Sequence, residues 1–168
     1  MTSNIGPDLV ALLPRLRRYA LSLTRDGGLA DDLVQGACEK ALAGARSWTP
    51  GTRFDAWMFR ILRNLWIDGL RRRRTEGIQD HMDDHEDIVG TDGNRETEMK
   101  LMFADVARAI DDLPTDQREV LLLTCAEDLS YREAAEVLGV PIGTVMSRLA
   151  RARRRLSEAT GAEPGMGN

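Results

Sequence analysis

Arginine and hydroxyl side chains concentrate in one short stretch of the chain, "GVPIGTVMSRLARARRRL" (Gly139–Leu156), which holds five arginines and no acidic residue. An arginine guanidinium can donate two hydrogen bonds to the O6 and N7 of a guanine, and serine or threonine hydroxyls bond base edges or phosphates. On a helix, this stretch has one apolar stripe, made of Val145, Leu149, Ala152 and Leu156. The charged side chains therefore lie on the other faces, and their chemistry is that of contact with a nucleic acid.

The polar residues of this stretch follow an order that favours DNA contact. Four of them cluster near its N-terminal half, where a recognition helix places the side chains that read bases: Thr144, Ser147, Arg148 and Arg151. Arg153–Arg155 follow, and we expect them to meet backbone phosphates. The alternative is a solvated helix end whose positive charge complements the helix dipole, which explains Arg153–Arg155 but not arginines along the whole exposed face.

A second basic surface lies in "RFDAWMFRILRNLWIDGLRRRR" (Arg53–Arg74). Phe54 and Trp57 fall on its apolar stripe, so we expect them to pack in a core. Trp66 lies off that stripe, where it could either stack on an unpaired base or cover a neighbouring helix. The loop before this segment carries side chains that could hold a flipped base, namely Trp48, Thr49 and Thr52.

Residue patterns for other chemistry are missing. Cys38 and Cys125 are far apart and form no CxxC pair, so we expect two buried, reduced thiols. His81 and His85 are spaced for a metal site but lack the glutamate that follows the first histidine of a zinc-protease helix, and we favour a solvated segment. The chain also has no phosphate-binding GxxxxGK and no nucleophile elbow. We therefore expect no metal, no cofactor and no enzymatic activity.

Charge divides the chain into three parts. The whole chain has a net charge of −4. Residues 1–75 carry 13 basic and 7 acidic residues, residues 76–100 carry 2 and 9, and residues 101–168 carry 8 and 11. Because residues 76–96 are polar, acidic and interrupted by glycines, they are typical of a linker. We therefore predict domains at residues 1–75 and 101–168, a flexible acidic linker at 76–100, and a disordered tail from about residue 159.

Helical spacing dominates both predicted domains. Aromatic residues make up only 5% of the chain, so the cores must be built mainly from Leu, Val, Ile and Ala, which favours helices. The spacing predicts a helix that ends at Asp26-Gly27-Gly28, then helices at about 30–45 and 54–74. Beyond the linker it predicts a helix that ends before Pro114 and further helices at 115–129, 131–138 and 142–156. Ser130 and Glu133 form a capping-box sequence before a tight turn at Gly139, which indicates a helix-turn-helix in an all-α protein.

Four segments together resemble a bacterial RNA polymerase sigma factor of the extracytoplasmic-function (ECF) type. In chain order they are "ADDLVQGACEKAL", "FDAWMFRILRNLWIDGLRRRR", "LPTDQREVLLL" and "SYREAAEVLGVPIGTVMSRLARARRRL". The resemblance covers about residues 9–157. It implies two helical domains, sigma region 2 and sigma region 4, which match the division by charge.

The resemblance also implies three groups of functional residues. The helix at 30–45 would bind the clamp helices of the polymerase's largest subunit, through Asp31, Asp32, Gln35 and Glu39. The loop at 47–53 and the next helix would recognise the promoter minus-ten element and hold it open, through Trp48, Thr49, Thr52, Arg53, Arg60, Arg63, Asn64, Ile67 and Arg71. The helix at 142–156 would read the minus-thirty-five element in duplex DNA, through Pro141, Gly143, Thr144, Ser147, Arg148, Arg151, Arg154 and Arg155.

The same resemblance implies the partners. They are core RNA polymerase (its largest and second-largest catalytic subunits), promoter DNA and an anti-sigma factor, in a stress or envelope response. The N-terminal residues lack a signal-peptide pattern, and no run approaches 18 apolar residues, so we expect a cytoplasmic protein without membrane insertion. Two positions depart from the family: Gly36 interrupts a helix, at a cost of about 1 kcal/mol against alanine, and Met146 stands where the family often has lysine.

Two other classes of protein share parts of this pattern. A sigma mimic that sequesters an anti-sigma factor normally carries a receiver domain, for which 168 residues leave no room, and it has little need of a basic reading face. A plain helix-turn-helix repressor does not explain the N-terminal helices. Promoter-specific transcription with core polymerase separates a sigma factor from both alternatives.

Overall fold

Every regular element of the described chain is helical. The computed structural model describes residues 4–77 and 98–161, with side chains in the second range from residue 104 onwards. Seven α-helices occupy these two ranges, and neither range contains a strand, which confirms the all-α prediction. None of these helices is long and apolar enough to cross a membrane. Most of the predicted linker lies outside the described residues, and so do His81 and His85.

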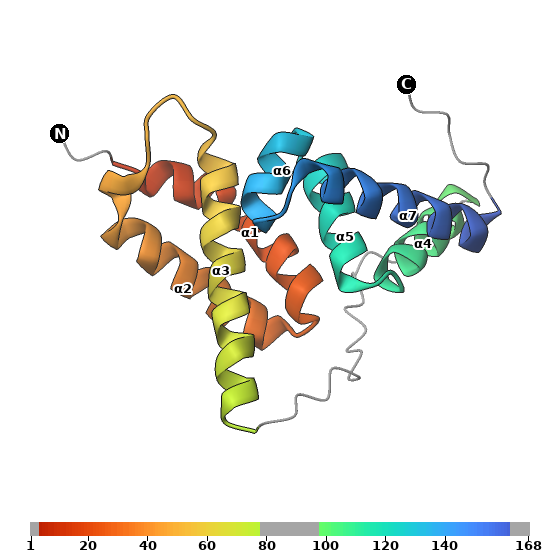
Figure 1. Ribbon diagram of the computed structural model, residues 1–168, viewed down its shortest axis with the longest axis horizontal. Helices are drawn as coiled ribbons and strands as arrows, with labels where there is room; N and C mark the ends of the chain where they lie inside the picture. The colour runs from red at the N-terminus through yellow and green to blue at the C-terminus, as the bar shows by residue number, and fades with distance from the viewer. Residues whose placement is uncertain (1–3, 78–97, 162–168) are drawn as a thin grey trace.

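The N-terminal domain is a bundle of α1 (Gly6–Thr24), α2 (Gly27–Ala43) and α3 (Phe54–Thr75), with a short 3₁₀ helix, Ala45–Ser47, after α2 (Figure 1). The fully buried residues of α2 are alanines, which let the neighbouring helices approach closely: Ala30, Ala37 and Ala41. Larger side chains of α1 and α3 fill the remaining space, among them Leu16, Tyr19, Leu23, Met58, Phe59 and Leu62.

The second helix begins earlier than the spacing predicts. Asp26 does not end the first helix but caps α2, because its carboxylate accepts a hydrogen bond of 3.0 Å from the backbone N–H of Leu29. The chain reverses at Arg25, whose φ of 55° is left-handed. Gly27 and Gly28 therefore form the first turn of α2 instead of a stop, and the predicted start near residue 30 is wrong.

The C-terminal domain consists of α4 (Glu98–Asp111), α5 (Thr115–Leu121), α6 (Tyr131–Leu138) and α7 (Ile142–Thr160). After α5 the chain continues in a π-helical turn, Leu122–Ala126. The capping box is confirmed, because Ser130 Oγ accepts from the Glu133 N–H at 3.1 Å and Glu133 Oε1 accepts from the Ser130 N–H at 2.9 Å. Gly139 follows with a φ of 65°, a conformation that favours glycine, and turns the chain into α7.

The last helix is longer than expected. It continues to Thr160 and ends at Gly161, whose φ is 69°. The expected start of a disordered tail at about residue 159 is therefore wrong for residues 159 and 160, because the backbone hydrogen bonds of α7 continue through them. Residues 162–168 lie outside the described part.

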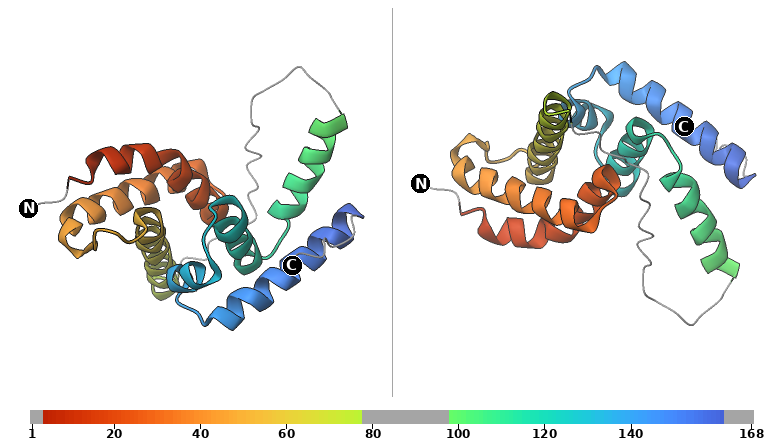
Figure 2. Two further views of the ribbon diagram at one scale, coloured as in Figure 1. Left: turned by 90° about the horizontal axis from the view of Figure 1, so that it is seen from above. Right: turned by 90° about the horizontal axis from the view of Figure 1, so that it is seen from below.

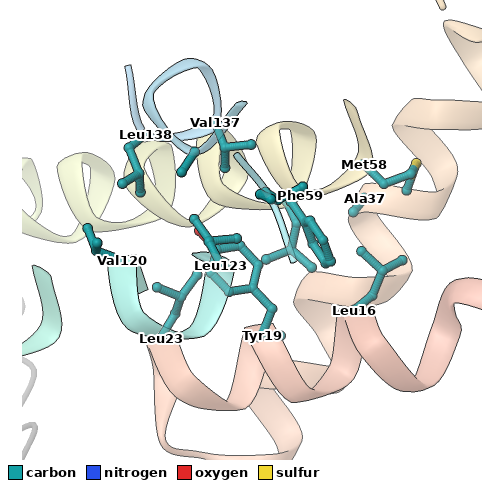
Figure 3. Close-up of a cluster of buried hydrophobic side chains, with 14 of the residues drawn as sticks. Leu16, Tyr19, Leu23, Ala37, Met58, Phe59, Val120, Leu123, Val137 and Leu138 are labelled. Carbon is teal, nitrogen blue, oxygen red and sulfur yellow. The ribbon is translucent and has the colours of Figure 1, made fainter. Parts of the chain in front are cut away.

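The two domains share one hydrophobic core. Tyr19 and Phe59 of the N-terminal domain meet edge to face, with ring centroids 5.4 Å apart. Leu123, Val137 and Leu138 of the C-terminal domain belong to the same buried cluster (Figure 3). Both views in Figure 2 place α6 beside α3 and α5 beside α1, in agreement with the contacts between these helices. We call this arrangement the closed form.

Arg118 joins three elements inside the fold. Its side chain is buried, and the residue is only 4% exposed. The guanidinium donates hydrogen bonds to the backbone oxygens of Ser22 at 2.8 Å, Asp111 at 3.1 Å and Leu113 at 3.0 Å. Burial lowers the pKa of Arg118, and these carbonyl dipoles replace the water that the charge has lost. Arg118 therefore fixes α5 against α1 and the end of α4.

Replacement of Arg118 is expected to destabilise the fold. Arg118→Met retains apolar volume but leaves three carbonyl groups without a donor, so we expect the free energy of unfolding to fall by about 2–4 kcal/mol. Urea denaturation followed by circular dichroism measures it. Arg17→Met is the control, because the exposed pair of Arg17 with Asp31 contributes about 0–1 kcal/mol. Equal losses for the two variants would contradict the role given to Arg118.

Candidate nucleic-acid interface

The outer face of α7 presents most of the residues predicted to read duplex DNA. Val145, Leu149 and Ala152 are buried, and α7 packs on α5, α6 and α4. The opposite face is open to solvent. Six predicted contact residues are exposed: Pro141, Gly143, Ser147, Arg151, Arg154 and Arg155. Thr144 and Arg148 are half-buried.

Arg148 lies at the edge of this face, beside α5. Its Nε is 3.7 Å from a carboxylate oxygen of Asp116, and its side chain is 23% exposed. Ser147 and Arg151 lie nearer the centre of the exposed face. The Ser147 hydroxyl donates to the backbone oxygen of Thr144 at 3.1 Å, and its lone pairs remain able to accept a further hydrogen bond. The geometry therefore favours Ser147 and Arg151 over Arg148 as readers of bases.

A polar stripe runs along the outside of α3. Arg60, Asn64 and Arg71 are exposed and Ile67 is half-buried, and steps of four, three and four residues place them on one side of the helix. Trp66 is half-buried and packs against the hydrophobic core, which favours the interpretation that it covers a neighbouring helix.

Two of the residues predicted to contact the minus-ten element are bound to the C-terminal domain instead of lying on this stripe. Arg63 Nε donates to Glu119 at 2.8 Å, and its Nη1 donates to the backbone oxygen of Leu138 at 3.3 Å. Arg53 Nη1 donates to the backbone oxygen of Asp128 at 2.9 Å and to Glu133 at 3.3 Å. In the closed form, some of the residues predicted to contact the minus-ten element therefore lie on the exposed stripe of α3, whereas Arg53 and Arg63 are bonded to the C-terminal domain.

The loop before α3 holds an aromatic cluster. Trp48 is half-buried and meets Phe54 edge to face, with ring centroids 5.5 Å apart. The indole Nε1 of Trp48 is buried without a hydrogen-bond partner in the described chain. Thr49 and Thr52 are exposed, and the Thr52 hydroxyl donates to the Thr49 backbone oxygen at 2.6 Å. This bond fixes a tight, solvent-facing turn next to the tryptophan.

All four residues predicted to bind polymerase are exposed on α2: Asp31, Asp32, Gln35 and Glu39. Gln35 Nε2 donates to Glu39 at 3.3 Å, which fits their spacing of one turn. Helix α3 does not approach α2 so closely that position 36 must be a glycine. A Cβ at Gly36 would lie 3.5 Å from the Leu65 side chain, which is an ordinary contact distance.

Two carboxylates of the C-terminal domain anchor the contact between the domains. The Glu127 side chain is fully buried and accepts hydrogen bonds from Arg15 and Arg18 of α1. Glu119 accepts from Arg63 and, at 3.3 Å, from the hydroxyl of Tyr19. Burial raises the pKa of Glu119, and the charge and hydrogen bond of Arg63 offset that effect only in part.

Asp55, in the N-terminal domain, pairs with two of the arginines that contact the C-terminal domain. Its carboxylate accepts hydrogen bonds from Arg53 at 2.7 Å and from Arg15 at 2.8 Å. Burial alone would raise the pKa of Asp55, but these two hydrogen bonds outweigh it and hold the pKa below its ordinary value. Two of the arginines that reach across to the C-terminal domain, Arg15 and Arg53, are thus oriented by a carboxylate of their own domain.

Sequence reasoning did not find this set of contacts. Arg15 and Glu127 are 112 positions apart, and no periodicity connects them. One signal was present: Glu119 stands directly before the apolar run Val120–Leu123, where a buried carboxylate needs a partner. Within the described residues, no group of three or more His, Cys, Asp or Glu side chains is placed to hold a metal ion.

Comparison with known families matches both domains. The family described as "Sigma-70 region 2" matches residues 9–76, and that described as "Sigma-70, region 4" matches residues 103–156. The ECF RNA polymerase sigma factor EcfG of Rhodopseudomonas palustris is 38% identical over 165 residues, which cover 94% of this chain and 85% of the relative. The chain belongs to the ECF family of sigma factors. Its resemblance to that family is thereby confirmed.

Further relatives and solved structures agree. The ECF sigma factor SigC of Mycobacterium tuberculosis is 37% identical over 131 residues, 78% of this sigma factor and 70% of SigC. The sigma factor RpoE of Bartonella quintana, solved with the anti-sigma factor NepR, has a TM-score of 0.74 and 33% identity, covering 95% and 98% of the two chains. CnrH, solved with the cytosolic domain of CnrY, has a TM-score of 0.61 and 30% identity, covering 96% and 93%.

Loss of Glu127 is expected to separate the domains without unfolding them. Glu127→Ala removes the acceptor shared by Arg15 and Arg18, and both arginines can be hydrated once α1 is released. We expect the contact to weaken by about 1–3 kcal/mol and the radius of gyration from small-angle X-ray scattering to rise, with helicity unchanged. Glu136→Ala, an exposed acid on α6, is the control. A radius of gyration that equals that of the control would show that Glu127 does not hold the domains together.

Proposed function

We propose that this sigma factor binds core RNA polymerase through α2 and directs it to promoters by two DNA contacts, one from each domain. ECF sigma factors as a family bind RNA polymerase and support promoter-directed initiation, and this chain is a member. The observation that carries the finer proposal is the pair of solvent-facing polar surfaces, one on α7 and one on α3. Figure 1 shows these two helices in different domains. Two separate surfaces suit two promoter elements.

The C-terminal domain would read the minus-thirty-five element as duplex DNA. The width of the major groove admits an α-helix, and the buried face of α7 leaves its outer face free to enter. Ser147 and Arg151 lie toward the N-terminal half, where base contacts are made. Arg154 and Arg155 are exposed one turn later and would hold phosphates, which fix the register of the helix on the DNA.

The N-terminal domain would bind the opened minus-ten element. The stripe of Arg60, Asn64 and Arg71 offers charge and hydrogen bonds to a single strand, and the turn beside Trp48 offers an aromatic wall for an unstacked base. Arg53 and Arg63 would join this surface only after they leave Glu133, Glu119 and the backbone oxygens of the C-terminal domain. The closed form must therefore open before all the predicted residues can reach DNA.

An anti-sigma factor is a further proposed partner. RpoE and CnrH, which resemble this chain, were solved with NepR and CnrY. A groove of about 670 Å³ lies between α1 and the α4–α5 side of the C-terminal domain. Its apolar lining includes Leu21, Ile110 and Leu122, and Arg17 and Arg18 contribute positive charge. Such a groove suits an amphipathic helix with acidic edges.

The protein would act in the cytoplasm, where the polymerase is, on genes of a stress or envelope response. It would confer promoter choice and leave the chemistry of RNA synthesis to the polymerase, without a cofactor of its own. Run-off transcription from a genomic promoter library with purified core polymerase tests this proposal. If no promoter-specific transcripts form while the protein binds an anti-sigma factor, the protein is a sigma mimic.

Substitution of two arginines of α7 separates base reading from phosphate binding. We expect Arg151→Ala to weaken promoter binding by about 1–3 kcal/mol and to relax selectivity at one or two minus-thirty-five positions. We expect Arg154→Ala to weaken binding to all promoters by the same factor. It should also reduce the magnitude of the slope of log K against the logarithm of the salt concentration by about one. Holoenzyme binding to a set of promoter variants at several salt concentrations measures both effects. A uniform loss with Arg151→Ala would show that Arg151 binds a phosphate.

Charge reversal on α2 tests polymerase binding. Asp32→Lys adds a positive charge to an exposed position, so the fold should stay intact while the affinity for core polymerase falls about tenfold or more, an effect of roughly 1.4 kcal/mol. Asp8→Lys reverses an exposed acid of α1 and is the matched control. Fluorescence anisotropy of labelled protein titrated with core polymerase measures the affinity. If the two variants bind core polymerase equally, α2 is not the docking helix.

A further inference from the structure

Two large apolar side chains lie in the open on the helix that the proposed function places in DNA. Ile142 is 47% exposed and Met146 is 53% exposed. They are one helical turn apart, so their side chains lie on the same side of α7. Single exposed apolar residues such as Leu42 on α2, which is 59% exposed, are common on protein surfaces. A pair at one-turn spacing in the N-terminal half of a recognition helix forms a continuous apolar surface, and such a surface indicates a contact with a partner.

The exposed side of α7 carries two chemically distinct rows of side chains. Steps of four residues place Ile142, Met146 and Ala150 along one edge, and Ser147, Arg151 and Arg155 in a row nearer the centre. Gly143 lies between the two rows at the start of the helix, and a Cβ there would meet nothing within 4 Å beyond its chain neighbours and the helix's own backbone. The space between the rows is therefore shallow at the start of the helix, and the apolar edge can approach a flat surface closely.

The major groove offers one apolar group to such an edge, the C5-methyl group of thymine. We infer that Ile142 and Met146 read thymine methyl groups in the minus-thirty-five element, so that this edge selects T·A pairs while Ser147 and Arg151 read hydrogen-bonding groups. The inference rests on the proposed function of α7. It adds two specificity residues that the hydrogen-bonding chemistry of the sequence did not identify.

The dimensions suit a short run of base pairs. Four residues of α-helix rise about 6 Å, and successive base pairs are about 3.4 Å apart. The two side chains can therefore reach methyl groups no more than about two base-pair steps apart. Methionine is unbranched and adaptable, which allows its thioether to follow a methyl group whose position shifts with the sequence. A lysine at position 146, common in the family, would supply charge instead and would lose this contact.

Deoxyuridine substitution tests the inference, because it removes the methyl group of thymine and nothing else. The minus-thirty-five element is first defined by run-off selection with the holoenzyme. Each of its thymines is then replaced by deoxyuridine, and dissociation constants of the holoenzyme for the duplex are measured by competition. We expect affinity to fall about three- to fivefold at one or two thymines, the effect of one buried methyl group.

Variants of the protein, measured on the same thymine and deoxyuridine duplexes, test which side chain contacts each methyl group. Met146→Ala should lose affinity for the thymine duplex by a similar factor and should no longer distinguish thymine from deoxyuridine at its position. Met146→Leu should restore the distinction, and Ile142→Ala should abolish it at a neighbouring position. Val10→Ala is the matched control, an exposed apolar truncation outside α7, and should retain the full sensitivity to deoxyuridine.

The outcomes separate this inference from the proposed function. If the holoenzyme selects a minus-thirty-five sequence but binds thymine and deoxyuridine duplexes equally, or if that sequence contains no thymine, the inference is wrong and the function of α7 stands. If Met146→Ala weakens both duplexes by the same factor and keeps the distinction, Met146 contacts something other than the methyl group, such as a polymerase subunit, and the inference is again wrong. If the holoenzyme shows no minus-thirty-five selectivity, the proposed function itself fails.

Discussion

Glu119 and Glu127 are carboxylates of one domain whose partners belong to the other. Glu127 is fully buried between Arg15 and Arg18, and Glu119 is buried against Arg63 and Tyr19. A buried carboxylate costs several kcal/mol unless a positive charge and hydrogen bonds replace its water. The two domains can therefore pack in this way only if these arginines meet these acids. The apolar contacts of Phe59 with its neighbours supply attraction without direction, and the ion pairs set the orientation.

The same constraint connects the packing to the proposed DNA contacts. A carboxylate and a phosphate present similar oxygen acceptors to a guanidinium. In the closed form Arg53 and Arg63 bond Glu133 and Glu119, and in the proposed open form they would bond the DNA backbone. The acids of the C-terminal domain thus occupy arginines that DNA would otherwise use. The charge division seen in the sequence therefore has a structural counterpart, in which basic helices of one domain face acidic positions of the other.

Local features could be predicted from the sequence, and long-range ones could not. The apolar stripe of α7, the capping box at Ser130 and the helical class all depend on residues within a few positions of one another. The role of Asp26 was misjudged because a glycine pair can end a helix or lie in its first turn, and only the hydrogen bond to Leu29 decides between them.

The candidate site follows the same division. Exposure of Ser147 and Arg151 follows from the helical period, whereas the half-burial of Arg148 depends on Asp116 of α5, 32 positions away. Arg53 and Arg63 were correctly placed on a basic segment of the sequence, but nothing local indicates that the C-terminal domain binds them. Pairing across domains leaves no periodic pattern, because each partner sits in an ordinary helix and only the tertiary fold brings the two together.

Three acids near the contact between the domains have shifted pKa values, with different causes. Burial would raise the pKa of Asp55, but hydrogen bonds from Arg53 and Arg15 of its own domain lower it, and the Ser130 backbone N–H of the capping box is the main cause that lowers the pKa of Glu133. The stabilisation that these two acids contribute is present at neutral pH and is lost as the pH falls through the lowered pKa values. The pKa of Glu119 is raised, so its contribution is present at acidic pH and is lost as the pH rises through that raised value. Asp55 and Glu133 therefore stabilise their own domains first, whereas Glu119, the acid that spans the contact, is buried at a cost that Arg63 offsets only in part. Separation of the domains would return Glu119 to water and would release Arg63 in the same step.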